Sequence, residues 1–310
     1  MIGFDATKLR LLAAYQNNKL PHAILLGGKK GIGKASFAKE FALELLGTGA
    51  LLARDGTADH PDLLLLKKED GKREIGVEQV REISGFVNQT SSISKNKFII
   101  IDAADDLNRS SANALLKILE EPHDNNFLIL VAHNLSKVLP TIKSRCQIIN
   151  VAPLTFAQFA QVLLETRPKF LPKIPDDEIK ILGDICDNSP ALAIQSQEDL
   201  TGLYAEFLSS IKNKKLGEIL LKKIADKNFN FEIFTLVVNF FLKRLSLYHT
   251  GQIDYFIFDE KEVFATLNTK FSAEEIFTLS DEARAGLART LSLNLDKKLF
   301  LINLFNRICF

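Results

Sequence analysis

Five short apolar runs mark the first half of the chain. They lie at residues 23–26, 62–66, 98–102, 127–131 and 147–151. Within each run, apolar residues follow one another without alternating with polar ones, the pattern of strands buried on both faces of a parallel sheet. Amphipathic segments with helical spacing separate the runs. Because strand–helix alternation favours right-handed crossovers, the pattern predicts a doubly wound α/β layer that ends near residue 152.

The pattern changes at Pro153, after which we find helical spacing only. The clearest helical segments are Thr155–Glu165, Asp176–Asp187 and Phe231–Leu247, and a further block begins within Gly202–Ile211. We therefore expect three domains: an α/β domain over 1–152, a small helical domain over 153–201 and an all-α C-terminal domain over 202–310.

The composition is that of an ordinary globular protein, with 46% hydrophobic and 25% charged residues among 310. A formal net charge of +1 gives no overall field that would attract DNA or RNA. The 3 cysteines form no C-x-x-C pair, which argues against a disulfide scaffold or a zinc site and fits a reducing cytosol. No signal-peptide pattern is evident, and the most apolar late segment, 233–242, is about half as long as a membrane-spanning helix. A cytoplasmic protein without a membrane segment is the expectation.

A glycine-rich segment, Gly28–Lys34, follows the first strand and opens a helix. Gly28, Gly31 and Gly33 allow backbone N–H groups to converge on a phosphate, and the helix N-terminus adds a favourable dipole. Lys34 would bring a positive charge to the outer phosphates. The plain alternative is a strand-to-helix turn that binds nothing. The strand–loop–helix context favours the phosphate loop.

The loop lacks a residue that ATP hydrolysis normally uses. A phosphate loop carries Ser or Thr after its lysine, where the hydroxyl binds the nucleotide's magnesium, and this chain has Ala35. Ser36 lies about 100° further round the helix and is a poor substitute. Asp102, at the end of the third run, is the acid expected on the magnesium side, while we expect Asp105–Asp106 to cap or solvate the following turn. Because the glycines and Lys34 are retained, ATP binding itself stays open.

Several segments carry a specific resemblance, and they occur in a fixed order along the chain. They are Leu20–Ala23, His60–Asp62, Ile75–Ile83 (IGVEQVREI), Ala112–Pro122 (ANALLKILEEP) and Leu139–Cys146 (LPTIKSRC). These segments resemble motifs of the bacterial clamp loaders, which are AAA+ ATPase assemblies, and most closely those of the delta-prime family of DNA polymerase III. The resemblance covers about residues 10–152. Beyond residue 200 only helical character and length agree.

The resemblance implies an α/β AAA+ P-loop domain, a helical lid and an all-α collar domain that holds five subunits together. It implies a hetero-pentamer with gamma/tau-type motor subunits and a delta subunit, which opens a sliding clamp and sets it on primed DNA. In this family the delta-prime subunit is a stator whose Ser-Arg-Cys arginine enters a neighbour's ATP site. Carried over, Arg145 would be an arginine finger in trans, since a fixed guanidinium meets the charge on a transferring phosphoryl group. The plain alternative is a surface arginine in a loop.

The chain also departs from the ATP-hydrolysing members of this family. Ala103 stands where a glutamate orients the attacking water, and Ala191 stands where the lid carries a nucleotide-sensing arginine. A polar sensor after the fourth strand could be His133 or Asn134, and the sequence does not choose between them. Many relatives carry a four-cysteine zinc module after the first helix. Because Gly47–Asp59 contains no cysteine, we expect no zinc.

Three classes of function remain: a stator that donates a finger, a self-sufficient P-loop ATPase, and a DNA-binding module. The DNA-binding interpretation depends on the basic pairs Lys29–Lys30 and Lys222–Lys223, and short clusters of this kind are usually solvated. The absent hydroxyl at Ala35 and the absent glutamate at Ala103 favour the stator. Phenylalanines crowd the late helices between 231 and 277; such residues are usually core, and the division between core and collar interface stays open.

Overall fold

The computed structural model describes residues 1–47, 51–52, 58–69, 71–72, 74–89, 91–166, 176–195, 200–226 and 229–310. Within these ranges the chain forms two compact units. The first unit contains Met1–Val162 and Ser189–Ala191, and the second contains Leu163–Asn188 and Leu192–Phe310. The three-domain division at residues 152 and 201 is finer than this and stays a prediction.

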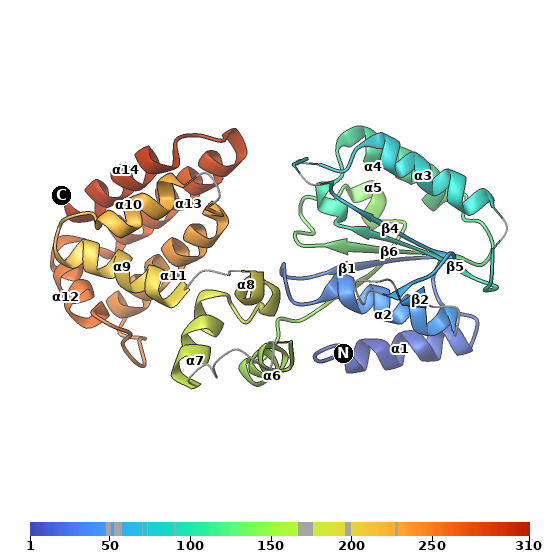
Figure 1. The fold of residues 1–310 in the computed structure, drawn as a ribbon, viewed down its shortest axis with the longest axis horizontal. Helices are drawn as coiled ribbons and strands as arrows, with labels where there is room; N and C mark the ends of the chain where they lie inside the picture. Colours follow the sequence, from blue (N-terminus) through green and yellow to red (C-terminus); the bar gives the residue numbers. More distant parts are fainter. Residues whose placement is uncertain are drawn as a thin grey trace. The chain divides into compact units, whose positions relative to one another are not determined.

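The first unit contains a parallel sheet of five strands (Figure 1). The strands are β1 (Ala23–Gly27), β4 (Leu63–Lys67), β5 (Lys97–Asp102), β6 (Asn126–Ala132) and β7 (Gln147–Asn150). Each predicted apolar run is therefore confirmed as a strand. The strands lie in the order β4-β5-β6-β1-β7, so β1, which leads into the glycine-rich loop, lies between β6 and β7. This order confirms the predicted α/β layer with a parallel sheet.

Helices cover both faces of the sheet. The helices α1 (Asp5–Gln16) and α2 (Lys34–Leu46) lie on one face, and α3 (Val77–Asn88), α4 (Arg109–Glu120) and α5 (Pro140–Lys143) lie on the other (Figure 1). Successive strand residues point to opposite faces. Ile24 and Leu26 accordingly pack with α1 and α2, whereas Leu25 packs with α3 and α4. The runs are continuously apolar because both faces are covered.

Several short elements of the first unit were not predicted. A 3₁₀ turn (Ala104–Asp106) follows β5, and β2 (Leu51–Leu52) pairs with β3 (Ala58–Asp59) in an antiparallel hairpin. The hairpin belongs to Gly47–Asp59, the segment without cysteine, much of which lies outside the described residues; the expectation of no zinc module is not tested there. Among the residues that the structure describes, no three His, Cys, Asp or Glu side chains are grouped as a metal site.

The described part of the second unit contains helices and no strand. Its helices are α7 (Asp176–Ile185), α9 (Leu200–Lys212), α10 (Glu218–Ala225), α11 (Phe231–His249), α12 (Glu260–Lys270), α13 (Ala273–Leu293) and α14 (Lys297–Cys309). The helices α6 (Phe156–Thr166) and α8 (Pro190–Gln195) contribute residues to both units. The helical segments expected after Pro153 are confirmed with small shifts at their ends. No helix in the described ranges has the length and apolar character needed to cross a bilayer.

The core of the second unit surrounds α11 and divides the phenylalanines. Those buried in the core are Phe231, Phe234, Phe240, Phe241 and Phe264, whereas Phe256, Phe258 and Phe277 are 39%, 54% and 67% exposed. The phenylalanines of α11 are therefore core residues. The exposed ones come from α13 and from the segment between α11 and α12.

A buried ion pair lies within this core. The Nε and Nη2 atoms of Arg244 donate to the Glu260 carboxylate at 2.5 and 2.6 Å. Glu260 also accepts from the Tyr204 hydroxyl and the Ile257 N–H. Arg244 also donates to the carbonyl of Tyr255 at 2.6 Å. Because buried charges need complete hydrogen bonding, this network fixes α9, α11 and α12 to one another.

Candidate functional site

The glycine-rich loop has the conformation that its sequence predicts. It leaves β1 after Gly27 and enters α2 at Lys34. Gly31 and Gly33 have φ values of 81° and 96°, a left-handed region that favours glycine. At Gly28 a Cβ atom would lie 2.7 Å from the carbonyl oxygen of Val151. Each of the three glycines in the motif is therefore required by the backbone.

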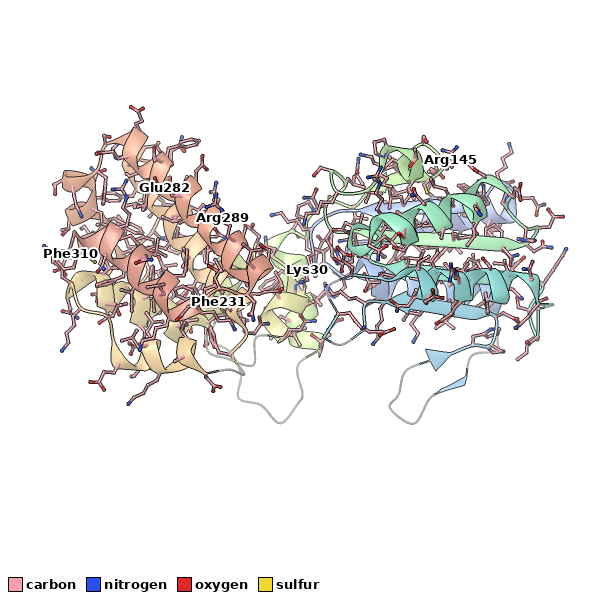
Figure 2. The ribbon with its side chains drawn as sticks, turned by 90° about the horizontal axis from the view of Figure 1, so that it is seen from above. Lys30, Arg145, Phe231, Glu282, Arg289 and Phe310 are labelled. Atoms are coloured by element: carbon pink, nitrogen blue, oxygen red, sulfur yellow. The ribbon has the colours of Figure 1, made fainter. Side chains whose placement is uncertain are left out.

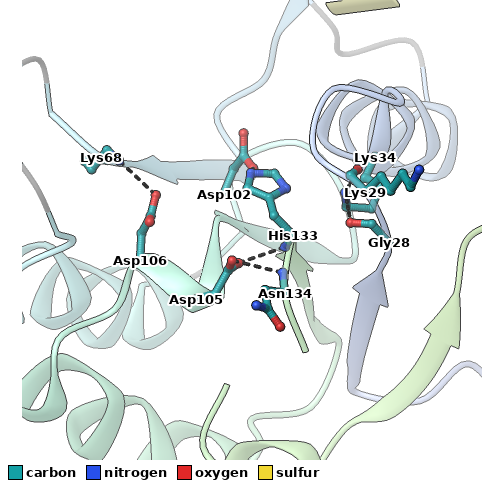
Figure 3. A network of polar contacts seen from close by, with 9 residues as sticks. All are labelled: Gly28, Lys29, Lys34, Lys68, Asp102, Asp105, Asp106, His133 and Asn134. Carbon is teal, nitrogen blue, oxygen red and sulfur yellow. Dashed lines mark hydrogen bonds and ion pairs between the residues drawn. The ribbon is translucent and has the colours of Figure 1, made fainter. Parts of the chain in front are cut away.

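The side chain of Lys34 folds back onto its own loop (Figure 3). Its Nζ atom donates to the Gly28 carbonyl at 2.6 Å and to the Lys29 carbonyl, and the residue is only 2% exposed. Burial lowers the pKa of Lys34 to about 8, although the carboxylates of Asp102 and Asp105 act in the opposite direction. The ammonium group of Lys34 is thus bonded to carbonyl groups of its own loop.

A later segment of the first unit donates hydrogen bonds to two further carbonyls of the loop. The Ser189 hydroxyl donates to the Lys30 carbonyl at 2.9 Å, and the Ala191 N–H donates to the Gly31 carbonyl at 3.1 Å. In the sequence, Ala191 is notable only because it stands where related lids carry a nucleotide-sensing arginine. Here the residue contributes its backbone. Nothing in the local sequence signals this contact, because more than 150 residues separate its two sides.

The residues present do not fit the magnesium of a hydrolytic ATP site. Ala35 has no hydroxyl, and Ser36 is exposed on the outer side of α2, as its position on the helix predicts. Ala103 is buried and offers no carboxylate. Asp102 is the one acid of the expected set that remains, and its Oδ1 atom is buried without a hydrogen-bond partner among the described residues. Burial raises the pKa of Asp102, partly offset by His133 and Lys34.

The loop after β6 distinguishes the two sensor candidates (Figure 3). The Nε2 atom of His133 lies 3.9 Å from Asp102 Oδ1, and burial together with the nearby Lys34 ammonium lowers the pKa of His133. The side chain of Asn134 instead accepts from the N–H and hydroxyl of Ser136, at 2.9 and 2.6 Å. His133 is the candidate whose side chain faces the site.

The expectation for Asp105 was wrong. Its carboxylate does not cap its own turn but accepts from the backbone N–H groups of His133 and Asn134, at 2.8 and 3.0 Å. Asp106 pairs with Lys68 at 3.1 Å. Parallel strands bring the ends of β5 and β6 side by side, so an acid after one strand reaches the loop after the other. Asp105 therefore fixes the loop that carries His133.

The Ser-Arg-Cys segment lies between α5 and β7. The Ser144 hydroxyl donates to the Thr141 carbonyl at 3.1 Å, which closes the turn after α5. Cys146 packs partly into the core, and burial raises the pKa of its thiol to about 11. Arg145 lies between these two anchors, at the surface of the α/β unit (Figure 2). Its Nη2 atom pairs with Glu120 Oε1 at 2.6 Å, and its Nη1 atom donates to the Thr141 carbonyl at 3.0 Å.

The topology separates Arg145 from the glycine-rich loop of its own chain. The loop and His133 follow the carboxyl ends of β1 and β6, and Asp102 is the last residue of β5, whereas Arg145 precedes the amino end of β7. In the register of β1 with β7, Ile24 pairs with Gln147. Arg145 is thus about six strand residues from the level of Gly28, or roughly 20 Å along the sheet. One side chain does not span that distance, so Arg145 does not serve the site of its own chain.

Comparison with known proteins finds relatives of the α/β unit. A family model described as "DNA polymerase III, delta subunit" matches residues 5–155. The DNA polymerase III subunit delta' of Pseudomonas aeruginosa is 38% identical over 184 residues, which are 56% of this chain and 54% of the relative. The subunit delta' of Escherichia coli is 31% identical over 156 residues, 46% of each chain. The matches thus span about half the length of these relatives.

A solved structure is also similar. A DNA polymerase III gamma subunit-related protein from Thermotoga maritima aligns with 96% of this chain and 97% of its own, at 22% identity and a TM-score of 0.48. That likeness is too low to add to the sequence matches. Residues 5–155 contain the glycine-rich loop, the ordered motifs and Arg145. Through this α/β region, which is about half of the chain, the protein is similar to the DNA polymerase III delta-prime subunits.

Proposed function

We propose that this chain is a stator-type subunit of a DNA polymerase III clamp loader and donates Arg145 as an arginine finger to the ATP site of a neighbouring motor subunit. The observation that carries the proposal is the position of Arg145. It lies at the surface, anchored by Ser144 and Cys146, at the end of the sheet opposite its own phosphate loop. A guanidinium in that position is available to another chain.

The partners follow from the same proposal. They are motor subunits of the gamma/tau type and a delta subunit in a hetero-pentamer, which acts on a sliding clamp and primed DNA. The chain's own site supports a passive role, because Ala35 and Ala103 provide no magnesium ligand or general base. Lys34 and the segment Ser189–Ala191 also engage the loop carbonyls. Any nucleotide bound there would not be hydrolysed.

The test is an ATPase assay with Arg145→Ala. Purified alone, the chain should show no ATPase activity above background. In a reconstituted loader, Arg145→Ala should abolish hydrolysis at the one site that it faces, since arginine fingers contribute about 10³ to 10⁵ in rate. The total ATPase rate of the loader should therefore fall only by the fraction that this one site contributes. Lys34→Ala should leave the loader's rate unchanged.

Two results would contradict the proposal. Brisk hydrolysis by the lone chain would identify a self-sufficient ATPase. An unchanged loader rate with Arg145→Ala, in a complex of normal composition, would remove the finger assignment. Thermal melting of the variant serves as the folding control, because Arg145 makes only surface contacts.

A further inference from the structure

Two motifs that lie apart in the sequence meet at Arg145. Glu120 is the last residue of α4 and belongs to ANALLKILEEP, whereas Arg145 belongs to LPTIKSRC. Their side chains form an ion pair with an Nη2–Oε1 distance of 2.6 Å. The helix α4 runs back along the sheet after β5, so its last turn arrives at the amino end of the strands, where β7 begins, and it packs against α5 there. The fold thereby brings the two motifs together.

The position of Glu120 is unfavourable for the helix itself. The C-terminus of a helix carries a partial negative charge, so a carboxylate in the last turn is repelled by the helix dipole. Here two carboxylates, Glu120 and Glu121, occupy the end of α4. A residue that breaks a local rule in this way is a candidate for a functional role. The Arg145 guanidinium supplies the compensating charge for Glu120.

The contacts of Arg145 fix the guanidinium from two sides. Glu120 engages Nη2, the Thr141 carbonyl engages Nη1 at 3.0 Å, and Ser144 Oγ lies 3.5 Å from Nη1. A guanidinium has five N–H donors, so these contacts leave donors for an incoming phosphate. A free arginine side chain carries about 2 kcal/mol of rotamer entropy, and such contacts reduce that freedom before the partner's nucleotide arrives.

We propose that Glu120 is a positioning residue: it holds the Arg145 finger in the orientation in which the neighbouring subunit receives it. This inference rests on the proposed function, because it deepens the role assigned to Arg145. Glu120 touches neither nucleotide nor reacting atoms of its own chain. It acts only through the arginine.

The test measures the finger-dependent ATPase rate, defined as the rate of the reconstituted loader minus its rate with Arg145→Ala. With Glu120→Gln this rate should fall by up to about fivefold, the range of a partly exposed ion pair. The fall should appear in kcat, with KM for ATP unchanged, because the finger acts on the transition state. Rising ionic strength should bring the finger-dependent rate of the wild type closer to that of Glu120→Gln, since salt screens the Glu120–Arg145 ion pair.

Glu121→Gln is the matched control. It removes the same charge from the next residue, which is exposed at the end of the same helix, and should leave the rate unchanged. Glu120→Gln should also have no effect in an Arg145→Ala background. The positioning role is overturned if Glu120→Gln leaves the rate equal or higher, if Glu121→Gln lowers it as much, or if the loss persists without Arg145. Should Arg145→Ala itself cost nothing, the finger assignment fails first, and the two failures are thereby distinguished.

Discussion

At the scale of single residues, the glycine-rich loop contains a charged side chain, Lys34, whose burial opposes folding. Lys34 is 2% exposed, and burial lowers its pKa from 10.5 to about 8. A lowered pKa means that the protonated form is more stable in the unfolded chain than in the native one. Between pH 8 and 10.5 the native state has released the proton and the unfolded state has not, so stability rises with pH across this window.

Substitution of Lys34 by methionine tests this sign. Lys34→Met removes the titration, so the wild type should gain roughly 1–3 kcal/mol of unfolding free energy relative to the variant between pH 7 and pH 10. Urea denaturation at a series of pH values measures the difference. Lys19→Met, at an exposed position, is the control and should run parallel to the wild type. If the unfolding free energy of Lys34→Met also changes with pH in parallel with that of the wild type, the Lys34 ammonium is solvated in the native state.

At the scale of elements, His60–Asp62 explains how β4 and β5 are joined. The Asp62 carboxylate accepts from the N–H groups of Ser92, Ile93 and Ser94, at 2.6, 2.9 and 2.8 Å, and so shapes the loop that enters β5. The Asp62 N–H donates to Nδ1 of His60 at 3.0 Å. Burial would raise the pKa of Asp62, but the three backbone hydrogen bonds outweigh it and lower the pKa. This motif is structural.

Asp62→Asn should destabilise the α/β unit by about 1.5–3 kcal/mol at pH 7, the range for hydrogen bonds to a charged group. Because the native pKa of Asp62 is lowered, the stabilisation is present above the unfolded value of 3.8 and is lost as pH falls through the native one. The difference in unfolding free energy between the wild type and Asp62→Asn should therefore become smaller in acid. Chemical denaturation at pH 7 and pH 3 measures it, with the exposed Asp124→Asn as control. If this difference in unfolding free energy does not change with pH, the effect comes from the shape of the side chain and not from its charge.

At the scale of the whole molecule, the chain has two compact units with separate hydrophobic clusters. The sheet of the first unit carries the loop and Arg145, and the Arg244–Glu260 pair stabilises the second. Removing one partner of a buried ion pair leaves the other charge uncompensated, which costs about 3–5 kcal/mol. Such damage should stay within the unit that contains it.

Glu260→Ala should therefore lower the stability of the helical unit by about 3–5 kcal/mol and leave the α/β unit folded. Hydrogen exchange followed by peptide mapping is the measurement, with loss of protection expected within residues 192–310. Glu262→Ala is the matched control, because Glu262 is 65% exposed and pairs with Lys212 at the surface. Simultaneous loss of protection in both units would show that they unfold as one.

Much of the α/β unit follows from local pattern. The apolar runs predict all five strands of the parallel sheet, and the glycine spacing predicts the conformation of the loop after β1, because a strand or a tight turn constrains residues close together in the sequence. The role of Asp105 was missed for the opposite reason. Its partners lie 28 and 29 residues away, after another strand.

The sequence by itself determined the order of the elements, the glycine loop, the absent hydroxyl at Ala35 and the presence of Arg145, since each is written in adjacent residues or in a helical or strand period. Tertiary structure alone decided which groups meet: Ser189 with the loop carbonyl of Lys30, and Glu120 with Arg145. It also placed Arg145 at the far end of the sheet from its own loop. The physical reason is that periodicity records which face of an element is buried, whereas contacts between distant elements depend on the path of the crossovers and the register of the strands.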